Sequence, residues 1–205
     1  VMLLMHGMPT WSFLYRHVIP KLLAAGYRCI APDHLGFGKS DKPTDPDWYT
    51  IARHTEILTS LITSLDLKDI TLVCQDWGGL IGLRVAAENP DRFARIVTAN
   101  TGLPDAQGIT ADKVEEVSNQ MRAYYDSLPI HANAIEMGMA MGSDDSGMGF
   151  LHWVKFCGES PGFSPQEVLT FSVGTLSEAE QKAYGAPFPD ETYLAGGRQF
   201  PSLVP

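Results

Sequence analysis

The sequence is poor in cysteine, in long apolar runs and in positive charge, and each shortage excludes a class of protein. Its three cysteines cannot all pair, so we expect Cys29, Cys74 and Cys157 to be reduced core thiols rather than a disulfide framework. No apolar run approaches the ~18 residues of a membrane-spanning helix. With 15 Lys and Arg against 24 Asp and Glu, the net charge of −9 argues against a nucleic-acid partner and favours a soluble protein.

The two ends of the sequence lack the signals of a complete chain. Residue 1 is a valine inside an apolar run, with no initiator methionine or leader before it, and the last residues, FPSLVP, close no structural element. We therefore expect an internal fragment whose core is incomplete at both ends. A cytoplasmic location is expected, and a periplasmic one stays open because a targeting segment could precede residue 1.

What the sequence does contain is a regular alternation of short apolar runs with amphipathic stretches. The size and the 44% of hydrophobic residues suit one globular domain with an insertion. Strands are expected at residues 1–5, 28–31, 70–74 and 94–99, and helices at 13–25, 51–65 and 77–87. Such alternation predicts an α/β fold with a mostly parallel sheet flanked by helices. Ligands of these sheets bind beyond the carboxyl ends of the strands.

After Pro104 this alternation stops. Residues 105–187 contain helical stretches at 113–125, 164–170 and 177–184 but no convincing buried strand. The run EMGMAMGSDDSGMGF is expected to be a flexible segment whose methionines fill gaps, because the thioether adapts to irregular spaces. We predict a core at 1–104, a helical cap at 105–187 over the carboxyl edge of the sheet, and a return to the core at 188–205.

Two features suggest chemistry but lack its full pattern. The run GFGKS at 36–40 has Asp33 where a phosphate-binding loop needs a glycine, and turn residues follow it instead of a helix. The six histidines show no metal-ligand spacing, so no metal is expected. His152, beside Trp153, is a candidate general base, but a structural role is the simpler interpretation on an inserted segment.

The strongest local signal is Cys74-Gln75-Asp76-Trp77-Gly78, where an apolar strand meets a helix. Small residues stand two before and two after Asp76, as in the sharp G-x-S-x-G turn that presents a nucleophile. An aspartate with an ordinary pKa near ~3.9 is already ionised at neutral pH and needs no base to attack. The alternative is a structural turn in which Asp76 only caps the helix.

A carboxylate nucleophile suits displacement at a saturated carbon that bears a leaving group. The product is an alkyl ester on Asp76, which water must cleave at the carboxyl carbon, and that step needs an oxyanion hole. The backbone N–H of Trp77 can supply one donor and Met8, in the loop HGMPTW after the first strand, the other.

Over nearly its whole length the chain resembles a haloalkane dehalogenase of the α/β-hydrolase fold. The matching stretches are HGMPTWSFLYR, APDHLGFGKSDKP, ITLVCQDWGGLIGL and YGAPFPDETYLAGGRQFP. The resemblance implies a cofactor-free hydrolysis in which Asp76 attacks the halogen-bearing carbon and two indole N–H groups, from Trp77 and the cap residue Trp153, hold the halide. It also places Phe150 in the substrate pocket. An indole N–H donates and cannot ionise, which suits an anion in an apolar pocket, whereas core packing is the alternative for Trp153.

The sequence departs from that family at two positions. The position of Met8 is Glu in the branch with a cap tryptophan and Asn in another, so Met8 can offer only its backbone N–H. Asn100, after the fourth strand, stands where some members have the catalytic acid, and a neutral amide cannot hold an imidazolium. The resemblance therefore puts the acid and the water-activating histidine outside these 205 residues.

Two other functions stay open at this stage. An epoxide hydrolase would share the Asp-Trp turn and would use cap tyrosines, with Tyr124, Tyr125 and Tyr184 as candidates. A ligand-binding relative could have kept the pocket and lost turnover. For a haloalkane dehalogenase the expected partners are a small halogenated alkane and water, with no nucleic acid or membrane. The complete protein is expected to be a monomer.

Overall fold

The strands form a parallel sheet in the order β2-β1-β3-β4. The computed structural model describes residues 1–103 and 110–204. All three pairings are parallel, and each strand is followed by a helical segment, as the alternating sequence predicts. The strands are β1 (Met2–Met5), β2 (Cys29–Ile30), β3 (Ile70–Gln75) and β4 (Phe93–Ala99).

Alternating side chains of the central strands build two apolar layers, one on each face of the sheet. Leu3 and Met5 pack with residues of α2 (Ile51–Ser64) and α3 (Trp77–Glu88) in the larger core cluster. Met2 and Leu4 point the other way and join a smaller cluster beside α1 (Ile19–Ala24). The sheet is therefore covered on both faces at β1.

The outer strand β4 is covered far less. Its residues Ile96 and Val97 are 49% and 50% exposed, although they belong to an apolar strand. A parallel strand normally buries both of its faces. The apolar faces of β4 are thus open surface in this chain.

The first predicted helix is wrong in its extent. Residues 13–25 form a short 3₁₀ segment, Ser12–Tyr15, and then α1, with a turn between them. Pro20 lies in the first turn of α1, where its missing N–H costs nothing, so the helix begins there instead of running through. The other predicted strands and core helices agree with the structure to within a few residues.

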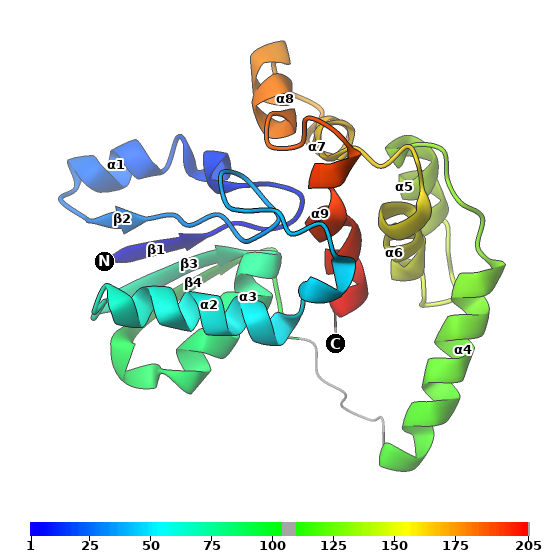
Figure 1. The fold of residues 1–205 in the computed structure, drawn as a ribbon, viewed down its shortest axis with the longest axis horizontal. Helices are drawn as coiled ribbons and strands as arrows, with labels where there is room; N and C mark the ends of the chain where they lie inside the picture. Colours follow the sequence, from blue (N-terminus) through cyan, green and yellow to red (C-terminus); the bar gives the residue numbers. More distant parts are fainter. Residues whose placement is uncertain (104–109, 205) are drawn as a thin grey trace.

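Beyond the carboxyl ends of the strands lies a group of helices that follow residue 110 (Figure 1). They are α4 (Val114–Ser127), α5 (Ala134–Gly142), α6 (Phe150–Glu159), α7 (Pro165–Val173), α8 (Glu178–Gly185) and α9 (Ala195–Gln199). The predicted boundary between residues 104 and 105 lies outside the described residues, so the division into core and cap stays a prediction.

The methionine-rich segment is more ordered than expected. Its first half is the helix α5, capped at Asn133, whose side chain accepts from two backbone N–H groups. Met137 is buried while Met139 is 69% exposed, so only some of these methionines fill gaps in the core. The expectation of a flexible segment is therefore wrong for residues 136–142, which are helical.

Short 3₁₀ segments connect these elements: Pro46–Trp48, Pro90–Arg92, Ala111–Lys113, Glu191–Tyr193 and Phe200–Leu203. The last of them brings Phe200, fully buried, into the larger core cluster. Figure 1 shows α9 next to the ends of the strands. The helix α9 therefore lies over the region where the chain turns from β3 into α3.

Candidate active site

Asp76 occupies a sharp turn between β3 and α3. Its φ is +52° and ψ −124°, a conformation that side-chain-bearing residues seldom adopt and that stores strain of order 1–3 kcal/mol. The turn can close only because its neighbours are small: a Cβ on Gly78 would collide with the backbone oxygen of Met5. The predicted turn is thus present, and sterics explain its glycine.

Hydrogen bonds from neighbouring segments hold the backbone of this turn. The Asp76 N–H donates to the oxygen of Asn100 at 3.2 Å. The Asp76 oxygen accepts from the Gly79 N–H at 2.8 Å and from the Thr101 hydroxyl at 2.7 Å. The end of β4 therefore helps to keep the strained turn in place.

The Asp76 carboxylate is partly buried and accepts a backbone hydrogen bond. The Met8 N–H donates to Oδ1 at 2.7 Å. Burial raises the pKa of Asp76 above its usual value, and hydrogen bonds from the N–H groups of Trp77 and Met8 only partly oppose that rise. The expectation of an unshifted pKa is therefore wrong, because the sequence does not show how far water is removed from this carboxylate.

The five residues to which the sequence assigns a site role line one cavity of about 470 Å³. They are Met8, Asp76, Trp77, Phe150 and Trp153. The volume lies within the range of small-molecule sites. The lining residues are Met8, Asp76, Trp77, Leu80, Asn100, Thr101, Gly102, Leu103, Phe150, Trp153 and Val204. The tertiary structure thus brings Phe150 and Trp153 next to Asp76 at the end of β3, although they lie far apart in the sequence.

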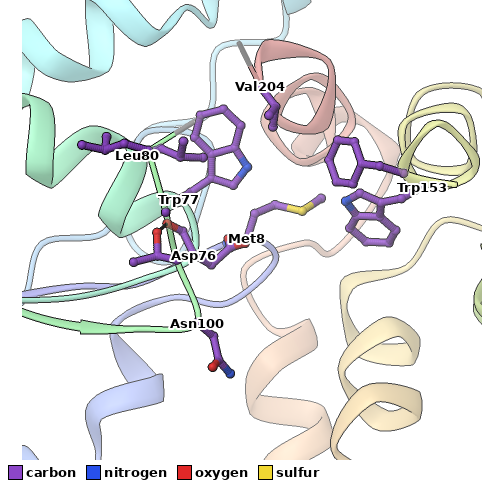
Figure 2. A pocket seen from close by; sticks show the side chains of 11 residues that line it. Met8, Asp76, Trp77, Leu80, Asn100, Trp153 and Val204 are labelled. Atoms are coloured by element: carbon purple, nitrogen blue, oxygen red, sulfur yellow. Dashed lines mark hydrogen bonds between the residues drawn. The ribbon is translucent and has the colours of Figure 1, made fainter. Parts of the chain in front are cut away.

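The two indoles face each other across this cavity. Figure 2 shows the ring nitrogens of Trp77 and Trp153 turned toward the space between them, with the Met8 side chain reaching into it. Trp77 is 4% exposed and packs on Phe200 at 4.7 Å between ring centroids. Within residues 1–103 and 110–204 neither indole nitrogen has a hydrogen-bond acceptor. Both N–H groups are therefore available to a ligand.

Asn100 lines the cavity without facing Asp76. Its φ is +45°, and Figure 2 shows its amide pointing away from Asp76. Its backbone oxygen, not its side chain, contacts the turn. In this position the amide contributes to the wall of the cavity.

Three histidines lie behind the turn, buried and neutral. His6 Nε2 accepts from the His34 N–H at 2.9 Å, and its Nδ1 donates to the oxygen of Gly7 at 2.9 Å. Burial lowers the pKa of His6 to about 4 and those of His34 and His54 to about 3. Among the residues whose positions are described, no histidine lines the cavity.

The glycine-rich run at 36–40 wraps around the carboxylate of Asp33. Asp33 accepts from the backbone N–H groups of Ser12 at 2.6 Å and Lys39 at 2.8 Å. A Cβ on Gly38, whose φ is +50°, would collide with that carboxylate. These backbone donors are already used inside the protein, so the run is a structural turn.

Sequence reasoning gave no role to several lining residues. Thr101, Leu80 and Val204 carry no chemical signal of their own, and only their place at strand and helix ends puts them here. Phe200, which packs on Trp77, lies in the stretch YGAPFPDETYLAGGRQFP, and the resemblance carried by that stretch is the signal that could have found it.

The described part of the chain offers no group of three metal-binding side chains placed to hold an ion. None of its helices combines the length and the apolar character needed to cross a bilayer. Its three cysteines are unpaired.

Comparison with known proteins connects this geometry to a family. The sequence model of the alpha/beta hydrolase fold family matches residues 1–143. The chain is 46% identical to a haloalkane dehalogenase of Psychrobacter cryohalolentis over 204 residues, which are 99% of this chain and 55% of that protein. It is 45% identical to haloalkane dehalogenase 1 of Mycobacterium tuberculosis over 203 residues, 98% of this chain and 56% of that one.

A solved structure agrees with these relatives. The tetrameric haloalkane dehalogenase of Paraglaciecola agarilytica NO2 superposes with a TM-score of 0.72 at 32% identity, over 100% of this chain and 56% of that one. The chain thus spans a little over half the length of the relatives it matches. With its parallel sheet, its strained turn at Asp76 and these similarities, the chain belongs to the alpha/beta hydrolase fold family and is, within it, similar to the haloalkane dehalogenases.

Proposed function

We propose that the complete protein hydrolyses haloalkanes to an alcohol and a halide ion through an ester on Asp76. The observation that carries the proposal is the cavity itself, where a carboxylate on a strained turn lies near two indole N–H groups that have no acceptor among the described residues. The relatives of the chain, named as haloalkane dehalogenases, support the same reaction. The substrate class is a small halogenated alkane, and the second reactant is water.

In the first step the carboxylate oxygen of Asp76 attacks the carbon that bears the halogen. A bond forms between that oxygen and the carbon, and the carbon–halogen bond breaks with its electron pair going to the halide. The N–H groups of Trp77 and Trp153 stabilise the charge that develops on the leaving halide, because both are donors placed at the side of the cavity where that charge forms.

In the second step water attacks the carboxyl carbon of the ester. The negative charge moves to the oxygen that already accepts from the Met8 N–H, and the Trp77 N–H adds a second donor. The alcohol leaves and Asp76 is restored. The resemblance assigns the activation of water to a histidine and an acid outside these 205 residues.

The cap tyrosines argue against epoxide opening. The hydroxyl of Tyr124 donates to Asp144 and that of Tyr125 to Glu159, both at 2.6 Å, while Tyr184 accepts from Arg16 at 3.1 Å. In the described part of the chain no tyrosine lines the cavity, so none is placed to protonate an epoxide oxygen.

Substrate choice tests the reaction directly. We expect the full-length protein to release bromide continuously from a 1-bromoalkane and to leave styrene oxide unchanged. Ion chromatography follows the halide, and gas chromatography follows the epoxide. Opening of styrene oxide without halide release would favour the epoxide hydrolase, and binding of the bromoalkane without any turnover would favour a ligand-binding relative.

A halide site formed by the N–H groups of Trp77 and Trp153 predicts weaker halide binding in the Trp153→Phe variant. Phenylalanine keeps most of the apolar area and removes the N–H, and a lost charge-assisted hydrogen bond costs ~1.5–3 kcal/mol, or about tenfold to a hundredfold in affinity. Quenching of indole fluorescence by bromide measures the Kd. Trp48→Phe is the matched control, since Trp48 lies outside the cavity. Equal Kd values for Trp153→Phe and the original protein would leave Trp153 a packing residue.

Three further expectations stay proposals. The cap is proposed to span residues 105–187, the complete protein to be a monomer and its location to be cytoplasmic. Size-exclusion chromatography with light scattering tests the monomer.

A further inference from the structure

Two buried histidines contact each other in the helical region, away from the catalytic turn. His131 Nε2 lies 2.8 Å from His152 Nδ1, and His152 Nε2 lies 3.5 Å from Asp144 Oδ2. The two histidines are 8% and 7% exposed. None of the three side chains lines the cavity, so the proposed reaction does not use them directly.

The helix that contains His152 also contains two residues that line the cavity. α6 contributes Phe150 and Trp153 to the lining, and His152 precedes Trp153 by one position. Because successive residues on a helix differ by about 100° in direction, a contact that holds His152 also fixes the rotation of α6 and hence the direction of Trp153. At the next turn the Lys155 ammonium donates to the oxygen of Tyr125 at 2.9 Å.

We propose that His152 is a positioning residue that, held between His131 and Asp144, sets the direction in which Trp153 presents its N–H to the departing halide. The inference rests on the proposed function, because it concerns the same halide site. It assigns to His152 a role different from that of a general base.

The contact requires that at least one of the two rings be uncharged, and this makes the positioning sensitive to pH. One facing nitrogen must donate and the other accept; when both rings are protonated, each facing nitrogen carries a hydrogen and the contact breaks. Burial lowers the pKa of His131, with the neighbouring His152 as a second cause, so at neutral pH its ring is uncharged. Acidification is therefore expected to loosen α6.

The charged groups around the two histidines do not prevent their protonation as the pH falls. Asp144 accepts from the Tyr124 hydroxyl, and hydrogen bonds from Ser146 and Tyr124 lower its pKa to about 2, so its negative charge offsets that of a protonated pair. Glu136, on α5, acts on His131 in the same sense. Arg198, on α9, donates to the oxygen of Ser160 at 2.9 Å and is already engaged.

Two substitutions at His131 separate positioning from packing. Gln places an amide close to the position of Nε2 and does not titrate, whereas Leu fills the space without a polar group. In the full-length protein the bromide Kd of each variant is measured by fluorescence quenching from pH 8 to pH 5. We expect His131→Leu to weaken bromide binding about tenfold at pH 8, as for one lost hydrogen bond. His131→Gln should retain the original Kd at pH 8 and lose affinity less steeply than the original protein as the pH falls.

The proposal is overturned if His131→Leu binds bromide as the original protein does at pH 8. It is also overturned if His131→Gln keeps the original pH dependence, a readout that still decides should the leucine variant fail to fold. A purely structural pair would lower the thermal midpoint and leave both bromide measurements unchanged. Trp153→Phe in the same assay separates the two proposals: if it has no effect, the halide grip fails, and if it alone weakens binding, only the positioning role fails.

Discussion

The Asp76→Asn variant is expected to release no halide from a haloalkane while it stays folded. The amide has nearly the shape of the carboxylate, and its oxygen can still accept from the Met8 N–H, which lies 2.7 Å away in the original protein. It carries no charge and is a poor nucleophile, so the ester cannot form. The loss should be complete within the detection limit of ion chromatography, whatever the substrate.

The fold of this variant should be no less stable at neutral pH than that of the original protein. Burial raises the pKa of Asp76 in the folded state, so protonation of Asp76 stabilises the fold. This contribution is full below the unfolded pKa near 3.8 and is lost as the pH rises through the folded pKa. At pH 7 the buried charge is therefore a cost that the amide avoids. The thermal midpoint at pH 7, measured by calorimetry, should not fall below the original value.

Asp69→Asn is the matched control for this experiment. Asp69 also has a positive φ, +49°, and lies outside the cavity, so its replacement changes an aspartate of similar backbone conformation without touching the site. It should keep full turnover. Rapid-quench mass spectrometry of the original protein should show one alkyl adduct on the peptide that contains Asp76. Undiminished halide release by Asp76→Asn, or an adduct on another residue, would contradict the assignment of the nucleophile.

Acidification is expected to begin destabilising the protein near pH 6.5, above the range in which ordinary carboxylates are protonated. His6, His34 and His54 are buried, and burial lowers their pKa values to about 4, 3 and 3. In the unfolded chain each titrates near 6.5, so the unfolded state takes up protons first, and stability is lost as the pH falls from 6.5 toward 4. For each histidine the free energy of unfolding falls by up to about 1.4 kcal/mol per pH unit.

Urea unfolding at a series of pH values between 8 and 4 measures this slope. His54→Leu should reduce it by up to one proton, and it also removes His54 Nε2, which is buried without a partner among the described residues. His17→Gln, a change at an exposed histidine outside the cluster, should leave the slope unchanged. A stability independent of pH between 6.5 and 4.5, or an equal slope in His54→Leu, would show that these rings do not resist protonation.

Local patterns were sufficient for the order of the elements and for the turn at Asp76. Short apolar runs located β1 and β3, and the helical spacing of apolar residues located α2 and α3, because these patterns depend on neighbours along the chain. The small residues around Asp76 were equally readable, since Gly78 is required by a backbone contact only one strand away. The predicted helix at 13–25 was wrong because a proline near its middle favours a new start over a continuous helix.

Long-range contacts lay beyond such patterns. No spacing in the sequence shows that α6 turns Trp153 toward Trp77, or that His131 meets His152 across 21 positions. The raised pKa of Asp76 and the lowered pKa values of the three buried histidines depend on how much water the finished fold removes, which is a property of packing and not of residue type.

The sequence by itself therefore determined that this chain is an α/β protein with Asp76 on a tight turn, Trp77 beside it and Met8 at the neighbouring strand end. These features follow from steric rules that act over a few residues or between adjacent parallel strands. The resemblance implied Phe150 and Trp153 for the pocket, but only the tertiary structure decided how they close the cavity, that Asn100 turns its amide away and that the histidines are held neutral. Those outcomes are set by which distant surfaces pack together, because the free energy of removing side chains from water depends on all the neighbours that the complete fold supplies.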